Sequence, residues 1–210
     1  MNKDEQYWHN KHPRVIQEYR GRPLPNGTMY VMDVRHFIWH DDYRLQEEAM
    51  TVCHDQNPDT CAHEVQKYVV QRLKYVSDDT LGHPEYFLFP AETLAMSQGD
   101  CEDGAILIAS MLLSTIQPED YWRVRVACGF VRPEPTAPLG GHGYCCYCRR
   151  TDNEWVALDW CYLEDSEHAV AQKDLIRVRA EYEGVWFSFN HLHAWSHNQQ
   201  VFEGRTRSGQ

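Results

Sequence analysis

Two segments in the first half of the chain have hydrophobic positions at helical spacing. In residues 61–76, "CAHEVQKYVVQRLKYV", apolar side chains recur every three or four positions, which predicts a helix with one apolar face. In residues 101–113, "CEDGAILIASMLL", apolar residues cover most of the helical circumference after the first turn. This second pattern predicts a helix that is buried on nearly all sides.

The second half of the chain alternates between apolar and polar positions. Residues 121–131, "YWRVRVACGFV", have the two-residue period of a strand. The segments "HGYCCYC" and "EWVALDWCYL" flank the turn-like "RRTDN", which predicts a β-hairpin. Helices followed by mostly antiparallel strands indicate an α+β fold.

The length of 210 residues suits one domain with decorated ends. We expect residues 1–59 to form an N-terminal extension, with a strand and a helix, that packs on the core. Residues 60–190 are predicted to be the core, and residues 191–210 a polar C-terminal tail.

The balance of charge limits the partners that the chain can take. The formal net charge is -11, so we expect no nucleic-acid binding through a broad basic surface. No apolar run has the length needed to span a membrane, so no membrane partner is expected. The N-terminus lacks the apolar stretch of a secretory signal, which favours a cytoplasmic location or a particle assembled in the cytoplasm, such as a virion.

Cys101 stands at the start of the predicted buried helix, in "QGDCEDGAILIAS". Unpaired backbone N–H groups and the helix dipole favour a thiolate at such a position, and the thiolate is the reactive form. The neighbouring acids Asp100, Glu102 and Asp103 oppose this effect by charge repulsion. The alternative is a buried structural thiol without chemistry.

A nucleophilic thiol needs a base, and the base needs a group that orients it. His142 begins a predicted strand, and Asp159 lies on the next strand, after the hairpin turn. The two side chains share a face only if the hairpin pairs even-numbered residues with odd-numbered ones. In that register Asp159 can fix the tautomer of His142, and His142 can take the thiol proton.

These motifs resemble those of a known enzyme family. The segments "FPAETLAMSQGDCEDGAILIASMLL", "GGHGYCCYCRRTDNEWVALDW" and "KYVSDD" are similar to transglutaminase-like cysteine peptidases of the bacterial type, over about residues 60–162. The resemblance implies a papain-like core in which the helix that carries the cysteine packs on an antiparallel sheet. It also implies that Cys101 is the nucleophile, His142 the base and Asp159 the orienting residue of an acyl-enzyme mechanism on a protein or peptide amide.

The chain departs from the family pattern in several places, and these departures leave alternatives open. The family usually has "HAW" or "HAY" at the histidine, where this chain has "HGY", and "CCYC" replaces a polar strand. The ends, including "YEGVWFSFNHLHAW", lie outside the shared core and look like those of phage-encoded chains. The alternatives to hydrolysis are transamidation by the same mechanism and a non-catalytic structural or binding module, such as a virion component with assembly partners.

The resemblance also suggests groups around the nucleophile. Gln98 is a candidate second oxyanion donor beside the backbone N–H of Cys101, and Tyr86 is a looser alternative. No cofactor is required, but acids of this motif bind Ca²⁺ in the adhesin-cleaving branch of the family, and carboxylates suit that ion. The alternative is that these acids only cap the helix. The candidate calcium ligands are Asp100, Glu102 and Asp103.

The remaining cysteines and histidines are expected to have structural or incidental roles. With no export signal, reduced thiols are the expected state, although the C-x7-C spacing of Cys53 and Cys61 also fits a local disulfide. Alternation sends Cys145 to the face opposite Cys146 and Cys148, which argues against one metal site for these thiols. The histidines of the tail are expected to be solvated.

Overall fold

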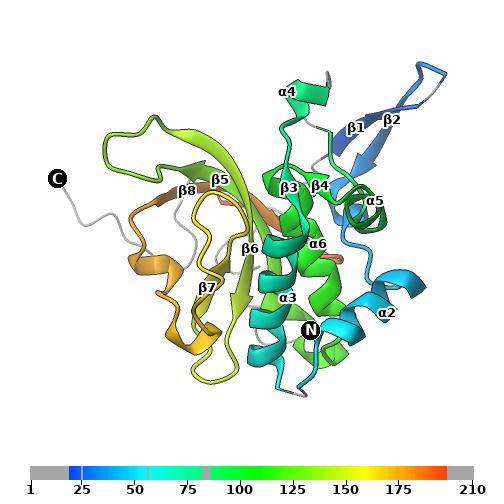
Figure 1. Ribbon diagram of the computed structural model, residues 1–210. Coiled ribbons are helices and arrows are strands. Elements are labelled where there is room, and N and C mark those ends of the chain that lie inside the picture. The colour runs from blue at the N-terminus through cyan, green and yellow to red at the C-terminus, as the bar shows by residue number, and fades with distance from the viewer. Residues whose placement is uncertain (1–18, 25, 56, 82–85, 198–210) are drawn as a thin grey trace.

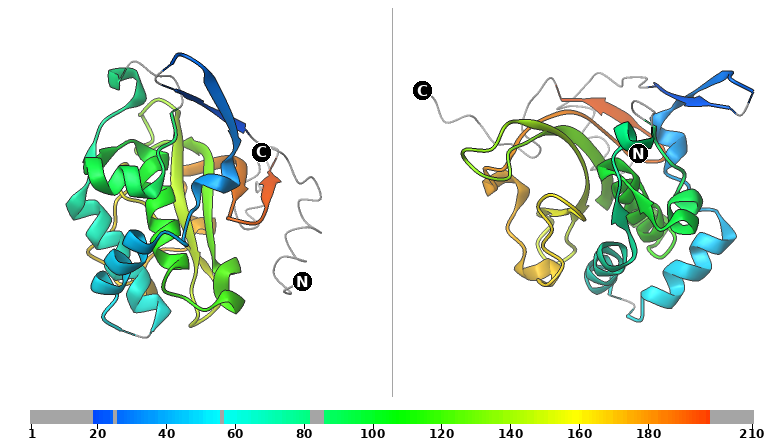
Figure 2. Two further views of the ribbon diagram at one scale, coloured as in Figure 1. Left: turned by 90° about the vertical axis from the view of Figure 1, so that its right-hand side faces the viewer. Right: turned by 45° about the horizontal axis from the view of Figure 1, so that its top comes forward.

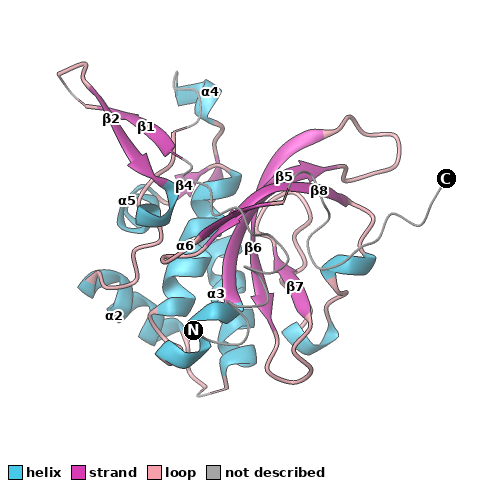
Figure 3. Ribbon diagram, turned by 180° about the vertical axis from the view of Figure 1, so that it is seen from behind, coloured by secondary structure: helices cyan, strands magenta, loops and turns pink. Residues whose placement is uncertain are grey.

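The structure is a computed structural model that describes residues 19–24, 26–55, 57–81 and 86–197. It is an α+β fold in which the helices gather on one side of a five-stranded antiparallel sheet, as Figures 1 and 3 show. The fold class expected from the sequence is therefore confirmed. The strands of this sheet follow the order β7-β6-β5-β8-β9 and comprise Val124–Val131 (β5), Gly140–Cys148 (β6), Trp155–Leu158 (β7), Tyr182–Phe189 (β8) and Ala194–Ser196 (β9).

The helices precede the large sheet in the chain. They are Tyr43–Val52 (α2), Pro58–Arg72 (α3), Asp78–Leu81 (α4), Pro90–Met96 (α5) and Cys101–Leu113 (α6). Short 3₁₀ helices span Val34–Phe37 (η1), Pro118–Arg123 (η2), Val170–Gln172 (η3) and Ile176–Val178 (η4). Two small sheets complete the fold: the antiparallel hairpin Tyr19–Pro23 (β1) with Met29–Asp33 (β2), and the parallel pair Lys74–Tyr75 (β3) with Gln98–Gly99 (β4).

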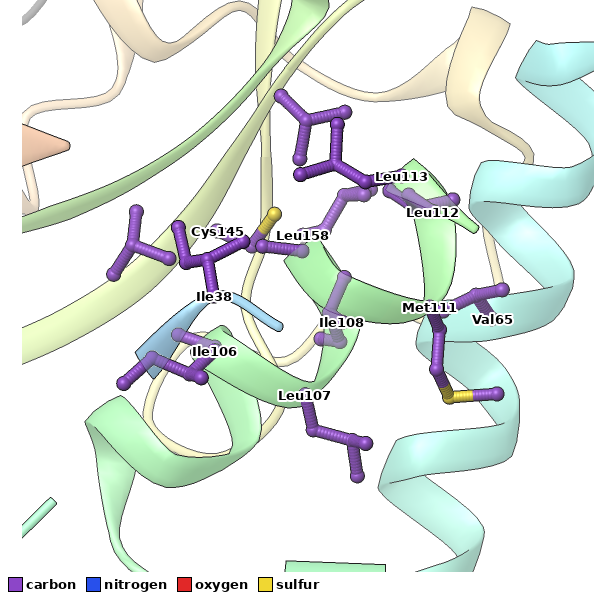
Figure 4. Close-up of a cluster of buried hydrophobic side chains, with 14 of the residues drawn as sticks. Ile38, Val65, Ile106, Leu107, Ile108, Met111, Leu112, Leu113, Cys145 and Leu158 are labelled. Atoms are coloured by element: carbon purple, nitrogen blue, oxygen red, sulfur yellow. The ribbon is translucent and has the colours of Figure 1, made fainter. Parts of the chain in front are cut away.

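Helix α6 forms the centre of the core, as its sequence pattern predicts. Every residue from Glu102 to Leu113 is buried. Figure 4 shows apolar side chains of α6 between Val65 of α3 on one side and Cys145 and Leu158 of the sheet on the other. The nearly continuous apolar surface of this helix is therefore explained by neighbours on several sides, which are α2, α3, α5, β5 and β6.

The sheet has an apolar core on each face, and the strand period divides the thiols of β6 between them. Cys145 belongs to the large core beside α6, whereas Cys146 and Cys148 belong to a smaller core on the opposite face. The alternation expected for the "CCYC" segment is thus confirmed.

Two expectations about the chain outside the core need correction. Cys53 and Cys61 form a disulfide, with their Cα atoms 4.9 Å apart, although reduced thiols were expected. The reason is that Cys53 ends α2 and Cys61 lies in the first turn of α3, so the short connection brings the two helix ends together. The other six cysteines are free.

The second correction concerns the expected polar tail, residues 191–210, of which residues 198–210 lie outside the described part of the chain. Ala194–Ser196 form the edge strand β9 of the large sheet, and the Trp195 side chain is fully buried in the smaller core. An aromatic side chain in a short segment can drive it onto an open sheet edge, which a composition-based reading of the segment misses. His193 and His197 lie in this segment, and the buried Nε2 atom of His197 is hydrogen-bonded to the Ser188 hydroxyl.

The described part of the N-terminal segment contains both expected element types. Phe37 and Leu45 are fully buried in the large core, so η1 and α2 pack against it. The hairpin β1–β2 instead projects from the body beside α4 and α5, as Figures 1 and 2 show. Across the residues described by the structure, no helix has the length and hydropathy that a membrane crossing requires.

Candidate active site

The first turn of α6 is held in place by hydrogen bonds that start and end in neighbouring elements. Asp103 accepts the backbone N–H of Asp100 at 3.1 Å and the backbone N–H of Leu88 at 2.7 Å. The parallel pair β3–β4 sets Tyr75 opposite Gly99, two residues before Cys101. Asp103 therefore caps the helix, as one of the two alternatives for the acids anticipates, and the cap fixes the position of Cys101.

Trp160 fixes the same turn from the side of the sheet. Its Nε1–H donates to the backbone oxygen of Cys101 at 3.0 Å. The indole lies so close to α6 that a Cβ atom on Gly104 would be 2.2 Å from Nε1. Glycine at this position permits the close approach, which holds the backbone of Cys101 against the segment that follows β7.

The thiol of Cys101 is turned toward an acid of its own motif. Its sulfur lies 3.1 Å from Oε2 of Glu102 and is placed to donate to that carboxylate. Burial raises the pKa of the Cys101 thiol well above its usual range, and the charges of Glu102 and Asp100 raise it further, while the backbone N–H of Gly143 acts in the opposite direction. The resting side chain is thus a neutral thiol.

The acids beside the thiol share a buried position and repel one another. Burial and the charge of Asp100 raise the pKa of Glu102 well above its ordinary value. Burial and Asp100 also raise the pKa of Asp103 to about 8, against the lowering effect of its two backbone hydrogen bonds. Ligand atoms of Asp100, Cys101 and Glu102 all lie within 4.8 Å of one another. Of the three acids predicted as calcium ligands, Asp103 is outside this group.

His142 and Asp159 meet on one face of the sheet. The β6–β7 hairpin pairs Cys145 with Leu158, and so pairs odd-numbered with even-numbered residues as the shared face requires. Nε2 of His142 and Oδ2 of Asp159 are 2.6 Å apart, and both side chains are almost completely buried. The register therefore brings together two residues that are 17 positions apart in the chain.

Asp159 has further partners that hold its carboxylate and backbone. The Tyr182 hydroxyl donates to Oδ2 at 3.1 Å, and the backbone N–H of Cys161 donates to Oδ1 at 3.1 Å. Gln66 donates to the backbone oxygen of Asp159 at 2.7 Å. Burial alone would raise the pKa of Asp159. His142 and the hydrogen bonds from Cys161 and Tyr182 outweigh burial and hold the pKa below its ordinary value. The carboxylate is consequently ionised and fixed.

Cys101 and His142 line one cavity of about 360 Å³, together with Gly143. Other walls of this cavity come from Arg20, Tyr75, Asp78, Phe87 and Trp186. In the described part of the chain the thiol and the imidazole share no hydrogen bond, and Nδ1 of His142 is buried without a hydrogen-bond partner. The three predicted residues are thus assembled as a hydrogen-bonded His142–Asp159 pair and a separate thiol facing the same space.

Gln98, the candidate second oxyanion donor, belongs to the short strand that precedes Cys101. It lies in β4, opposite Lys74, and is absent from the described residues that line the cavity. Three other residues of the site were not singled out from the sequence. Tyr182 comes from a distant strand, Tyr75 lies in the short strand β3, and Trp160 follows the candidate aspartate directly. Trp160 had the clearest available signal, because it adjoins Asp159 in "LDW".

Comparison with solved structures finds proteins of similar fold. LapG of Legionella pneumophila is 20% identical with a TM-score of 0.48, and the match covers 74% of this chain and 87% of that one. Calcium-bound LapG is 19% identical with a TM-score of 0.47, covering 80% and 92% of the two chains. A protein of Cytophaga hutchinsonii that is proposed to be a cysteine protease is 14% identical with a TM-score of 0.44, covering 72% and 63%.

Searches of protein-family models and of curated proteins return no match. At these identities the similarities concern the fold alone. The phage-like character of the chain ends finds no support among them.

Proposed function

We propose that this protein is a thiol-dependent hydrolase that cleaves amide bonds of proteins or peptides. The observation that carries the proposal is the buried His142–Asp159 pair, which opens on the same cavity as a cysteine at a helix N-terminus. A thiol, a base and a group that orients the base are the three parts that nucleophilic catalysis by cysteine needs.

In the proposed reaction Asp159 accepts the Nε2–H of His142 and leaves Nδ1 as the base. Nδ1 takes the proton of the Cys101 thiol, and the sulfur attacks the carbonyl carbon of the substrate amide. Collapse of the tetrahedral adduct breaks the carbon–nitrogen bond, and His142 returns the proton to the leaving amine. Water then cleaves the thioester with His142 again as base, which regenerates the thiol.

The negative oxygen of the tetrahedral adduct needs hydrogen-bond donors. The backbone N–H of Cys101 belongs to the first turn of α6, where N–H groups have no partner within the helix. We retain Gln98 as the proposed second donor, which requires its side chain to turn toward the cavity.

The resting contact between Cys101 and Glu102 opposes the first step of this reaction. The thiol must leave Glu102 and reach Nδ1 of His142, and the charges of Asp100 and Glu102 disfavour a thiolate at that place. Any process that neutralises these two carboxylates lowers the pKa of the thiol and releases its proton from Glu102. The site is therefore self-inhibited in its resting state.

A bound Ca²⁺ ion fits these two carboxylates. Asp100 and Glu102 offer oxygen atoms within 4.8 Å of each other, and their mutual repulsion in a buried place is the condition that a divalent cation relieves. When bound, such an ion supplies positive charge beside the thiol. We propose Asp100 and Glu102 as the ligands and leave Asp103 as the helix cap.

Transamidation would follow the same course until an amine, instead of water, attacks the thioester. The alternative to an enzyme is a non-catalytic structural or binding module. The contact of the Cys101 thiol with Glu102 instead of His142 is the observation in its favour. The two classes differ in what they predict for the reactivity of Cys101.

Alkylation of the thiols with iodoacetamide across pH, mapped by mass spectrometry, tests the proposal. In the presence of Ca²⁺, the enzyme reading predicts that Cys101 reacts at least tenfold faster than the partly buried Cys161, and that His142→Ala removes this advantage. Equal rates for the two thiols would contradict it.

Hydrolysis of a denatured-protein peptide library provides the second measurement, with Cys101→Ala as the matched control. New peptide ends that appear with the wild type and not with this variant support hydrolysis. Cross-linked or amine-labelled products in the presence of a primary amine would indicate transamidation instead.

A further inference from the structure

A second recess adjoins the catalytic cavity, at the C-terminal end of α3. Its volume is about 290 Å³. Its walls are aliphatic or aromatic side chains and one thiol, from Val70, Leu73, Tyr75, Trp160, Cys161 and Tyr162. We call this recess the apolar groove.

The apolar groove borders the cavity that holds Cys101 and His142. Tyr75 lines both spaces. Tyr162 sits edge-on to the His142 ring, with the ring centroids 4.9 Å apart, and its hydroxyl is 3.2 Å from the hydroxyl of Tyr75. The two tyrosines therefore join the helix side and the sheet side of the site in a ridge between cavity and groove.

This ridge faces solvent. The residues Tyr75 and Tyr162 are 40% and 47% exposed, respectively, so their rings are available to a ligand that lies across them. Exposed tyrosines that hydrogen-bond to each other through their hydroxyls present flat apolar faces, which suits a polypeptide chain.

The two spaces differ in charge. The cavity has Asp78, Asp100 and Glu102 among its walls, whereas the described lining of the apolar groove has no charged side chain. A side chain that enters the groove loses water without gaining an ionic partner there. Transfer of an apolar side chain into such a place is favourable, and transfer of a charged one is costly.

We propose that the apolar groove binds an apolar side chain of the substrate polypeptide next to the bond at Cys101. This proposal rests on the proposed function and names its substrate class, a chain with an aliphatic or aromatic residue beside that bond. Because Tyr75 lines both the groove and the cavity that holds Cys101, the occupant is a residue close to the bond along the substrate chain.

Electrophilic peptide probes test the apolar groove without requiring turnover. Peptidyl chloromethyl ketones place the peptide on the acyl side of the bond, and N-chloroacetyl peptides place it on the amine side. In each series the residue nearest to the electrophile, or the next one, is Leu, Phe, Gly or Asp. The measured quantity is the second-order rate constant for alkylation of Cys101, read by mass spectrometry.

For the wild type we expect the Leu probe of one series to react about tenfold faster than its Gly counterpart, with the Asp probe slowest. Val70→Arg places a charge at the apolar groove and should bring the Leu-to-Gly ratio close to one. Val178→Arg, at an exposed valine in η4, is the matched control and should keep the wild-type ratio. Val70→Ala enlarges the groove and should raise the Phe-to-Leu ratio.

Equal rates for Leu and Gly in both series would overturn the proposal. So would a Leu preference that survives Val70→Arg, or failure of every peptide probe to reach Cys101. Cleavage of the peptide library separates this result from the proposed function. Selective alkylation without cleavage would support the binding role of the groove and contradict the hydrolase. Cleavage without residue preference would support the hydrolase and contradict the binding role of the groove.

Discussion

At the scale of single residues, the site depends on how firmly one carboxylate is held. Asp159 is buried and receives hydrogen bonds from Tyr182 and from the backbone of Cys161, in addition to its contact with His142. Its lowered pKa means that it stays ionised at neutral pH and does not compete with His142 for the proton. In the proposed mechanism Asp159 therefore acts through His142, as a positioning residue.

Asp159→Asn should keep the fold and lose most of the reactivity. The amide can hydrogen-bond to His142 but favours the wrong tautomer, a change that costs about 10⁴-fold in a serine protease with this arrangement. We expect the rate of Cys101 alkylation at pH 7 to fall at least tenfold, with circular dichroism unchanged. Tyr182→Phe, which removes one donor to Oδ2, is the milder companion variant. Full reactivity in Asp159→Asn would refute the positioning role.

The contact between His142 and Asp159 could be anticipated from the pairing of even-numbered with odd-numbered residues in the hairpin, because the two-residue period of a strand restricts which side chains share a face. The contact between Cys101 and Glu102 could not. Both side chains lie in one helical turn, and their orientation depends on Gly143 and the buried acids, which come from elements that meet only in the folded chain. Tyr182 is 23 positions from Asp159 and joins it only because β8 lies on the other side of β5.

His191 offers a test of pH dependence that lies outside the site. Burial lowers its pKa from 6.5 to about 4, and the neighbouring His40 adds to this effect. Between these two pH values the unfolded chain binds a proton that the folded chain does not, so stability falls as the pH is lowered through that window. We expect His191→Asn to flatten the decrease in melting temperature between pH 6.5 and pH 4, with His54→Asn at an exposed histidine as control.

At the scale of elements, close packing between α6 and the segment after β7 fixes the backbone of Cys101. Gly104→Ala should destabilise the protein by roughly 1–3 kcal/mol, because its Cβ atom would meet the Trp160 indole at 2.2 Å. Gly140→Ala is the matched control, since nothing lies within 4 Å of a Cβ atom there. Urea unfolding of both variants measures the difference. Equal midpoints would show that Trp160 moves aside freely and does not hold the turn.

The long elements were predictable because the spacing of apolar residues along each segment is regular enough to indicate a helix or a strand. The helix at 101–113 and the hairpin of β6 and β7 match the predicted segments. Strand β9 was missed because three residues in a polar segment give no period, and only the sheet edge beside β8 makes them a strand. The short pair β3–β4 was missed for the same reason, since each strand has two residues.

The Cys53–Cys61 disulfide closes a short loop between α2 and α3, and its removal has a predictable effect. Cys53→Ser with Cys61→Ser should lower the free energy of unfolding by about 2–3 kcal/mol, because the unfolded chain regains freedom. Chemical denaturation with and without reductant measures this change, and the double variant should not respond to reductant. A reductant response that persists in the double variant would point to other thiols.

The same bond bears on where the protein acts. Disulfides persist in oxidising compartments and are rare in the cytosol. The cytoplasmic or virion-associated location expected from the sequence stays a proposal, and this bond provides a way to test it. Thiol labelling of Cys53 in whole cells, before and after reduction, distinguishes the cytosol from an oxidising compartment, because a cytosolic protein would be labelled without reductant.

At the scale of the whole molecule, the catalytic cavity lies where three parts of the fold meet. The first turn of α6 supplies the thiol, strands β5 and β6 supply Cys128 and His142, and the hairpin β1–β2 supplies Arg20. Buried acids at such a junction lower the stability of the fold, because little water is present to screen the repulsion between the two carboxylates. A cation that binds Asp100 and Glu102 would therefore stabilise the whole fold and not only the site.

Calcium titration tests this coupling between charge and stability. We expect millimolar Ca²⁺ to raise the melting temperature and a chelator to reverse the rise. When Ca²⁺ is a hundredfold above its dissociation constant, the free energy of unfolding should increase by about 2.7 kcal/mol. Glu102→Gln should melt higher than the wild type without Ca²⁺, because one repelling charge is gone, and should lose the response to the ion. The exposed Asp174→Asn control should keep that response.

The two effects of Glu102→Gln separate the alternatives for the acids. If Asp100 and Glu102 only support the helix start, their loss lowers stability and Ca²⁺ changes nothing in either protein. If they form a cation site, the variant gains stability without the ion, and the wild type exceeds it only when the ion is present. Asp103 gives the reference for capping alone, because it already accepts two backbone N–H groups, so Asp103→Asn should lower stability with and without Ca²⁺ by a similar amount.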